Sequence, residues 1–500
     1  MRAFVKIIRF LIFAGILIPQ NAIGSQTEIS RVAENRVAST SSRDYVLLTP
    51  SRNIKKQLTT PNTIYVIKDN VNLGKQTIDI PENSILLFDG GRICNGLLIG
   101  NNAIFAGKPS IGVELKGTFQ NQLFYSSWFD NETPITVSAA KVVCLNNATF
   151  VIDDDRKLNE TLYLFGKGNL KGKGGSVSFV SKPPNAACVV CGTDGKTPIP
   201  WSGTIDNVVF NFTDYKYGIA MCNVAHCAVT NNTLNALTLP SYRSGKLLGR
   251  FNSADYTHVT CPQEDILIEG NVLNMHGNKE GTASKKAAYE SITVADFTDN
   301  VRILNNEINN STDDLGIHSC SNVLVEGNVI TTEGGRIYCA DSRDVIIAKN
   351  SLGCYSNSMG IMITMESQNR IGENIQIYDN YVHPIGSKKL DYGIRVNNGK
   401  HINIFNNKIE GQLHIGYCNE YVLENLSYHP IEVTEEDKIV DYVTVANNTF
   451  IQIYGNAWGK KSNTPHSVLF ENNTITGPNC FISNLPTVIS RWNVVNAGEK

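Results

Sequence analysis

The most constraining feature of this 500-residue sequence is a repeated motif in which two alternating apolar residues precede an asparagine. The motif reads apolar-x-apolar-x-x-Asn, as in Val323-Leu-Val-Glu-Gly-Asn328. Its asparagines are Asn232, Asn271, Asn306, Asn328, Asn350, Asn380, Asn407, Asn448 and Asn473. Neighbouring asparagines lie 22 to 41 residues apart, and the shortest spacing defines a unit to which longer copies add inserted loops. Such a repeat indicates a solenoid.

Two solenoids have repeats of about 20–29 residues, the leucine-rich repeat and the parallel β-helix. Both can carry an asparagine at this position, so the other half of the unit decides between them. That half contains a second short strand pattern, as in Gly316-Ile-His-Ser and Gly393-Ile-Arg-Val, where a leucine-rich repeat would be helical. The core positions are mainly valine and isoleucine. The sequence therefore predicts an all-β protein, a right-handed parallel β-helix solenoid with inserted loops.

The repeated asparagines have a structural explanation in such a solenoid. Each turn must round a corner, and a residue in the left-handed backbone conformation, which asparagine and glycine tolerate best, is expected there. Side-chain amides stacked on successive turns can also donate hydrogen bonds to one another. We therefore expect these asparagines to stabilise the fold and to take no part in chemistry.

The ends of the chain differ from its repetitive middle. Residues 1–24 combine a positive start, a short apolar run and a small-residue cleavage site, which predicts a signal peptide. The run is too short to span a membrane, which takes about 20 residues, and no later segment is apolar enough. The other expected parts are an N-terminal arm (25–60), the first turns of the β-helix (61–130), the main β-helix (131–480) and a C-terminal cap or tail (481–500). The protein is thus expected in the periplasm, at the cell surface or outside the cell.

Composition and cysteine spacing exclude other classes of function. A net charge of -2 lacks the basic excess that nucleic-acid binding needs. Cys188 and Cys191 are spaced as C-x-x-C, but no second pair with matching spacing follows, so no zinc module is predicted. In an exported protein these two cysteines are expected to form a disulfide or to be a buried pair of thiols.

Chemistry in a β-helix is expected on the outer face of a sheet, because side chains fill the interior. The residues that we align as inward on successive turns are Ile292, Ile317, Ile337, Ile361 and Ile394. The residues that follow them, and therefore face outward, are Thr293, His318, Tyr338, Met362 and Arg395. Since adjacent turns are about 4.8 Å apart, we expect His318 beside Tyr338 and Arg395 about three turns away.

Charged residues gather around this outward row. The candidate catalytic residues are Glu290, Asp313, Asp314, His318 and Tyr338, and the candidate substrate-binding residues are Arg336, Arg395, Lys285 and Lys286. Paired carboxylates can act as acid and base in glycoside cleavage, or can bind a calcium ion. Arginine and lysine can neutralise a uronate carboxylate, while histidine or tyrosine moves a proton in β-elimination.

Each candidate also has a purely structural explanation. Two aspartates before a strand are common in turns, and an outward histidine is commonly a surface residue. Tyr338 could simply cover the sheet, and Arg336 could pair with Asp314 of the preceding turn. The basic loop that carries Lys285 and Lys286 could be solvated without touching a ligand.

Over about residues 200–480 the repeat resembles the pectate-lyase-like superfamily of secreted bacterial β-helix proteins, which share the pectin lyase fold. This resemblance implies secretion and carbohydrate metabolism. Polygalacturonase-type hydrolases of this fold carry N-T-D, D-D, G-H-G and R-I-K motifs on successive turns. Here Asp313-Asp314 resembles the D-D motif, but Glu290 stands where an aspartate is expected and Arg336 follows two glycines with no histidine. These departures leave a different hydrolase or a lyase open.

Two classes of function therefore remain. The first is a carbohydrate-active enzyme, a polysaccharide lyase or glycoside hydrolase that cleaves an acidic, uronate-containing polysaccharide with no cofactor or with calcium. The second is a non-catalytic cell-surface or glycan-binding β-helix. In both the partner is a polysaccharide and not a nucleic acid, and the oligomeric state stays open.

Overall fold

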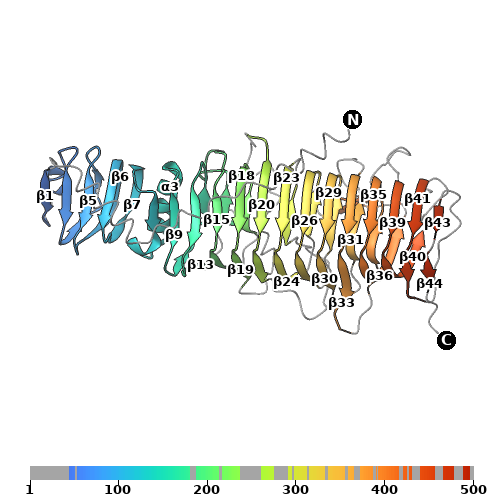
Figure 1. Ribbon diagram of the computed structural model, residues 1–500. Coiled ribbons are helices and arrows are strands. Elements are labelled where there is room, and N and C mark those ends of the chain that lie inside the picture. Colours follow the sequence, from blue (N-terminus) through green and yellow to red (C-terminus); the bar gives the residue numbers. More distant parts are fainter. Residues whose placement is uncertain are drawn as a thin grey trace.

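The chain winds into one elongated solenoid of short strands. Figure 1 shows them stacked one behind another from β1 (Tyr45–Leu48) at one end to β44 (Val494–Val495) at the other. This computed structural model describes residues 44–50, 53–180, 187–212, 217–236, 261–274, 291–295, 298–311, 315–332, 336–354, 359–364, 372–386, 390, 392–415, 421–424, 427–430, 440–455, 466–477, 488–491 and 493–495. Within these ranges the paired strands are parallel, except for the hairpin of β37 (Tyr421–Glu424) and β38 (Ser427–Pro430). The architecture is the predicted parallel β-helix.

Each turn of the main solenoid contributes up to three strands, and the first belongs to a 14-stranded sheet. In order along the solenoid this sheet contains β8 (Leu123–Tyr125), β9 (Thr149–Ile152), β12 (Asn169–Gly172), β15 (Thr204–Asp206), β18 (Ala225–Thr230), β20 (Glu264–Glu269), β23 (Asp299–Leu304), β26 (Ser321–Glu326), β29 (Arg343–Ala348), β32 (Glu373–Tyr378), β35 (Gly399–Phe405), β39 (Val440–Ala446), β41 (His466–Glu471) and β43 (Val488–Arg491).

The other strands of each turn lie mostly in an 18-stranded sheet with two rows. The first row contains β10 (Arg156–Leu158), β13 (Ser176–Phe179), β16 (Val209–Phe212), β19 (Thr233–Ala236), β21 (Val272–Asn274), β24 (Glu307–Ser311), β27 (Val329–Thr332), β30 (Ser351–Cys354), β33 (Tyr381–Pro384), β36 (Lys408–Ile415), β40 (Thr449–Gly455), β42 (Thr474–Ile475) and β44. The second row contains β22 (Ile292–Val294), β25 (Leu315–His318), β28 (Ile337–Ala340), β31 (Met359–Thr364) and β34 (Tyr392–Val396), and the ends of β36 and β40 continue it. In earlier turns a three-stranded sheet takes this side, with β11 (Leu162–Leu164), β14 (Ala187–Cys191) and β17 (Tyr217–Met221).

A buried ladder of asparagines runs along the corner between the 14-stranded sheet and the first row. It contains the nine asparagines of the motif and continues one turn further, to Asn493. In each member the backbone N–H and the side-chain Nδ2 donate to Oδ1 of the next member at 2.9–3.0 Å. Nδ2 also donates to a backbone carbonyl of the preceding turn, as Asn328 does to Ile303 at 2.9 Å. The predicted ladder is confirmed.

The left-handed corner residue is the one that precedes each ladder asparagine. Asn305, Gly327 and Lys349 stand at this position with φ of 53°, 71° and 54°. In several turns this residue is itself an asparagine, which explains the Asn-Asn doublets of the sequence. The first asparagine of a doublet accommodates the backbone conformation, and the second supplies the ladder amide.

Valine and isoleucine fill the interior of the solenoid. Ile303, Val325 and Ile347 occupy one register position on successive turns, and none of them is exposed. Fully burying such a side chain contributes about 1.5–3 kcal/mol relative to leaving it in water. Because each side chain is covered by the turns on either side of it, every turn depends on its neighbours.

The N-terminal end has its own seven-stranded sheet. Its strands are β1, β2 (Ile64–Ile67), β3 (Asn70–Asn72), β4 (Thr77–Asp79), β5 (Ile85–Phe88), β6 (Arg92–Gly107) and β7 (Ile111–Phe119). Strand β1 pairs with β2, and Leu48, Ile54 and Leu58 are buried in the core. The expectation of a loose arm over residues 25–60 is therefore wrong for its last part. Residues 1–43, with the predicted signal peptide, lie outside the described residues.

One helix and two short 3-10 turns were not anticipated. Helix α3 (Thr133–Leu145) packs against β7 and buries residues on most of its faces, as a helix that is apolar all round must. Short 3-10 turns lie at Ile54–Lys56 and Ser126–Trp128.

At the C-terminal end of the solenoid, β43 and β44 pair in parallel with β41 and β42. The solenoid thus continues into the segment 481–500, which was expected to be a cap or tail.

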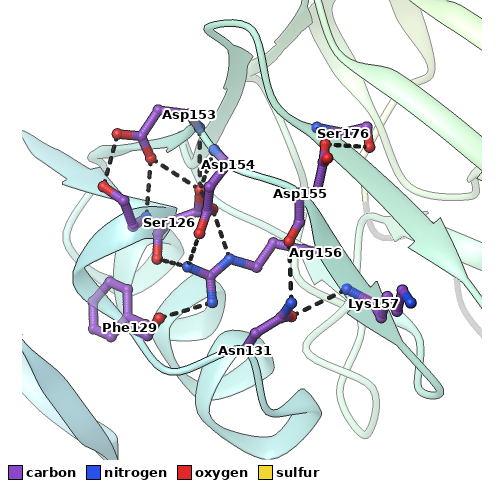
Figure 2. Close-up of polar contacts among 10 residues, drawn as sticks. Ser126, Phe129, Asn131, Asp153, Asp154, Asp155, Arg156, Lys157 and Ser176 are labelled. Carbon is purple, nitrogen blue, oxygen red and sulfur yellow. Dashed lines mark hydrogen bonds and ion pairs between the residues drawn. The ribbon is translucent and has the colours of Figure 1, made fainter.

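A buried arginine on β10, Arg156, holds the segment between β8 and helix α3 against the first turns of the main solenoid. Arg156 is 1% exposed, and its guanidinium donates to the backbone carbonyls of Ser126 and Phe129 and to both carboxylate oxygens of Asp154. Figure 2 shows this fork, with Asp153 bonded to Ser126 beside it. The buried charge is matched by a carboxylate and by hydrogen bonds, which is the condition for tolerating it. We assign this cluster a structural role.

Replacing Asn328 by alanine tests the ladder. The variant leaves the buried N–H groups of Asn306 without their acceptor, so we expect the free energy of unfolding to fall by about 3 kcal/mol. Urea unfolding followed by circular dichroism measures it. Asn403→Ala, on the outer face of β35, is the matched control, and an equal loss in both variants would contradict the role of the ladder.

Replacing Arg156 by alanine tests the junction. Two buried carbonyls and the Asp154 carboxylate lose their donor, so we expect a loss of about 3 kcal/mol in unfolding free energy. Arg156→Lys should recover little of it, because an ammonium cannot reproduce the planar fork. The exposed Arg302→Ala is the control, and differential scanning calorimetry gives the comparison. A fully stable Arg156→Ala protein would rule out this role.

Candidate functional site

The register of the second row differs from the one expected. Leu315 on β25 lies opposite Ile337 on β28, and Ile317 lies opposite Cys339. The alignment of Ile317 with Ile337 is therefore wrong by two residues. Both Leu315 and Ile317 face inward, so the alternation of apolar residues fits either register. The observed one preserves the 22-residue spacing of the ladder asparagines in these turns.

The corrected register produces one continuous outward row. Its members on successive strands are Thr293, Gly316, Tyr338, Met362, Arg395 and His414. We call this set the outward row. Arg395 lies three strands beyond β25, the strand of His318, as expected, whereas Gly316, and not His318, occupies the outward row on β25.

Around Tyr338, members of the outward row and two neighbouring side chains, Arg336 and His318, form a compact cluster. The guanidinium carbon of Arg336 lies 4.4 Å from the centre of the Tyr338 ring, and the His318 ring centre lies 5.3 Å from it. Arg336 also donates from Nη1 to the sulfur of Met362 at 2.9 Å. Tyr338 and Met362 are only 4% and 1% exposed although they face away from the solenoid interior, whereas His318 and Arg336 are half-buried. His318 is thus beside Tyr338, reached across the diagonal of the sheet.

A second cluster surrounds Arg395, two turns further on from Tyr338. Its Nε donates to Oδ1 of Asn397 at 2.7 Å, and its guanidinium carbon lies 5.2 Å from the ring centre of Tyr392. The ring centres of Tyr392 and His414 are 5.7 Å apart in an edge-to-face arrangement. A cation over an aromatic face and a fixed Nε hydrogen bond restrict the guanidinium to one orientation.

Sequence reasoning did not assign Tyr392 or His414 to the site. Tyr392 precedes the inward Ile394 by two residues, and strict alternation would turn it inward as well, so the strand pattern did not mark it. His414 is hidden by the irregular register between Ile409 and Gln412, where β36 joins both rows of the sheet. No motif in the sequence marks that join.

The remaining sequence candidates, Glu290, Asp313, Asp314, Lys285 and Lys286, lie outside the described residues. Among the residues that the structure describes, no group of three or more histidine, cysteine or acidic side chains is arranged to hold a metal ion. The groups that the structure brings together are therefore cationic, aromatic and imidazole side chains.

Cys188 and Cys191 lie on one strand, β14, and both are fully buried. In this structure they are thiols, like the other eight cysteines within the described ranges. Burial raises the pKa of both thiols well above its ordinary value, so neither is a ready nucleophile. Of the two alternatives, the pair of buried thiols is the one observed.

A family model described as the right handed beta helix region matches residues 285–413, which carry the outward row from Thr293 to Arg395. The protein is a right-handed parallel β-helix. No curated protein sequence matches the chain. No helix within the described ranges is both long and apolar enough to cross a membrane.

Solved structures with a similar fold include a surface adhesin, PfbA of Streptococcus pneumoniae. It is 11% identical, with a TM-score of 0.41 over 72% of this chain and 87% of that chain. The A-module of the mannuronan C-5 epimerase AlgE6 of Azotobacter vinelandii is also 11% identical, with a TM-score of 0.34 over 90% and 96% of the two chains. The alginate lyase AlyF-OU02 is 12% identical, with a TM-score of 0.29 over 94% and 86%.

A second polar surface lies where the strands of the 14-stranded sheet begin. An open hollow of about 370 Å³ there is lined by Arg343, Asp344, Glu373, Asn374 and His401. Its acidic residues outnumber its arginine, and Asn374 donates to Asp344 at 2.5 Å. This hollow has no excess of positive charge for an acidic ligand, so we place the candidate site on the outward row instead.

Asp299, at the same edge of the sheet, contributes to the stability of the protein in acid. Burial opposes ionisation of its carboxyl, but hydrogen bonds from Ser321 at 2.6 Å, from Asn322 at 2.7 Å and from the backbone of Asn300, together with the charge of Arg343, lower its pKa. A lowered pKa in the folded state stabilises the protein above the unfolded value of about 3.9, and this contribution disappears as the pH falls through the folded pKa.

We therefore expect Asp299→Asn to make the stability of the protein depend less on pH in the acid range. Between about pH 5 and pH 2 the melting temperature of the wild type should fall more steeply than that of the variant. Glu373→Gln, an exposed carboxylate further along the same edge, is the control. Parallel curves for the wild type and Asp299→Asn would contradict the assignment.

Proposed function

We propose that this protein is an exported polysaccharide lyase that cleaves a uronate-containing chain by β-elimination on the outer face of the second row. The observation that carries the proposal is that an arginine is grouped with a histidine and a tyrosine twice, two turns apart. Arg336 with His318 and Tyr338 forms one group, and Arg395 with His414 and Tyr392 forms the other.

The spacing of the two arginines suits a polymer. Arg336 flanks β28 and Arg395 lies on β34, two strands further along, which corresponds to about 10 Å at one turn per 4.8 Å. A polyuronate that runs parallel to the solenoid axis presents carboxylates at regular intervals. Each arginine can pair with one carboxylate through a planar hydrogen-bonded fork.

β-Elimination needs the functional groups that meet here. An arginine paired with the uronate carboxylate makes the neighbouring C–H bond more acidic, because it stabilises the charge that develops when the proton leaves. We assign His318, which is half-buried, as the base that takes this proton. The electron pair forms a carbon–carbon double bond as the glycosidic C–O bond breaks, and the leaving oxygen takes a proton from solvent water. Tyr338, buried beneath Arg336, positions both neighbouring groups.

The carboxylates Glu290, Asp313 and Asp314 define the competing hydrolase, in which one carboxyl acts as acid and the other as base or nucleophile. They would also supply oxygen ligands for calcium, and Lys285 and Lys286 would add positive charge for an acidic chain. The lyase is preferred because its functional groups already lie together among the described residues. A non-catalytic glycan-binding protein would use the same row without bond cleavage.

An assay of the purified protein on polyuronates and neutral polysaccharides, with and without calcium, tests the proposal. We expect ultraviolet absorbance of unsaturated uronide and new reducing ends to rise together on a polyuronate. His318→Ala should lower kcat at least about 100-fold, and Arg395→Ala should lower kcat/KM about 10- to 100-fold. Arg302→Ala, an exposed arginine on another face, should change neither.

Each alternative predicts a different result. Reducing ends without ultraviolet absorbance would show a hydrolase and direct attention to the three carboxylates. Binding of a polyuronate without any product would show a binding protein. Full activity of His318→Ala would remove the assigned base.

A further inference from the structure

A second asparagine ladder lies on the outside of the solenoid. It occupies the first row over strands β13 to β24, where Ser178, Asn211, Asn235, Asn274 and Asn309 face one another in register. Asn235 donates to Asn211 at 3.1 Å, and Asn274 donates to Asn235 at 2.8 Å. At one end of the ladder Asn211 donates to Oγ of Ser178, and at the other end Asn309 donates to Oδ1 of Asn274, each at 3.2 Å. We call this set the outer ladder.

The outer ladder differs from the buried one in what its amides leave unused. An asparagine side chain has two N–H donors and an oxygen with two lone pairs. In the buried ladder both donors are used, because Nδ2 also donates to a backbone carbonyl. In the outer ladder Asn235 and Asn274 each donate one hydrogen bond and accept one, and both are half-buried. Asn235 and Asn274, which lie on the outer side of the sheet, therefore each keep one N–H donor and one lone pair that no described residue uses.

An apolar row accompanies the amides. Val209, Thr233 and Val272 lie opposite one another on the same three strands, two residues before the ladder positions, and face the same side. The surface thus alternates a row of methyl groups with a row of amides. A pyranose ring has the matching character, with C–H groups on its faces and hydroxyls at its edge.

From these observations we infer that the outer ladder and its apolar row bind a neutral, hydroxyl-rich glycan chain aligned with the solenoid axis. The amides repeat about every 4.8 Å, a step similar to one residue of an extended β-linked pyranose chain. Over β16 to β24, the described members of the outer ladder and of the apolar row include one charged side chain, Glu307, which is exposed at one end. A neutral chain therefore fits this surface better than an acidic one.

The ladder also prepares the amides for binding. Each Nδ2 points toward the previous turn, so the free donors of successive turns are held in one orientation before a ligand arrives. Groups that are already ordered lose less entropy on binding. Asparagine is also a poor strand former, so strand propensity does not account for four of them at one outward position in succession. The ligand class and the residues differ from those of the proposed lyase, so this inference stands apart from it.

Affinity electrophoresis in gels that contain xyloglucan, glucomannan, galactomannan or mixed-linkage β-glucan tests the inference. We expect at least one of these neutral polysaccharides to retard the wild-type protein. The variant Asn235→Ala/Asn274→Ala should bind that polysaccharide at least about tenfold more weakly, because it loses two hydrogen-bonding groups. Asn403→Ala, a half-buried asparagine on the outer face of β35, is the matched control and should bind like the wild type.

A structural role must be separated from a binding role. Melting temperatures and circular dichroism spectra are compared first, and a conservative variant, Asn235→Thr/Asn274→Thr, keeps one hydroxyl donor per turn in a good strand former. The inference requires that a folded alanine variant loses retardation and that the threonine variant recovers part of it. It is overturned if none of the four polysaccharides retards the wild type, or if the folded alanine variant is retarded as strongly as the wild type.

Discussion

The buried amide ladder is the interaction on which the rest of the solenoid depends. A polar side chain inside an apolar core is costly unless its donors and acceptors are used, and here each amide is satisfied only when the next turn is in place. Asn328, for example, accepts from Asn306 and donates to Asn350. A shift of any strand by two residues would keep the apolar pattern but break this chain. The ladder therefore selects one register from several that hydrophobic packing alone would allow.

Because the register is fixed, the spacing of residues in the sequence determines which side chains are neighbours on the surface. Residues that lie far apart in the chain become neighbours at about one turn, so that each outward position becomes a row along the axis. The three described rows differ in character: arginine with aromatic and imidazole rings on the second row, uncharged amides on the first, and mixed charges at the edge near Asp299. The interior is nearly uniform, so packing does not dictate what these rows carry. Functional differences can thus arise without changes in the core.

The sequence was informative where one residue type has one physical role. The repeated asparagines predicted the fold class and the ladder, because few side chains satisfy both requirements of the corner. The register of Ile317 was misjudged because period-two alternation is unchanged by a shift of two residues. Helix α3 was missed because it is buried on most of its faces and so shows no one-sided helical periodicity. The folded end of the segment 25–60 was missed because its described strand, β1, has only four residues. Asp313 and Asp314 lie outside the described residues, so their place in the site stays a prediction.

The two proposed surfaces meet within a single turn. Strand β24 carries Asn309, the last amide of the outer ladder, and the next strand, β25, carries His318. The outer ladder, none of whose members is charged, therefore ends one turn before Arg336, which flanks β28. If both proposals hold, the substrate is a polysaccharide that offers neutral residues to one side of the solenoid and uronates to the adjacent side, such as an acidic backbone with neutral branches. The neutral part would then contribute affinity at a distance from the bond that breaks, and a simple polyuronate would be cleaved but held less tightly.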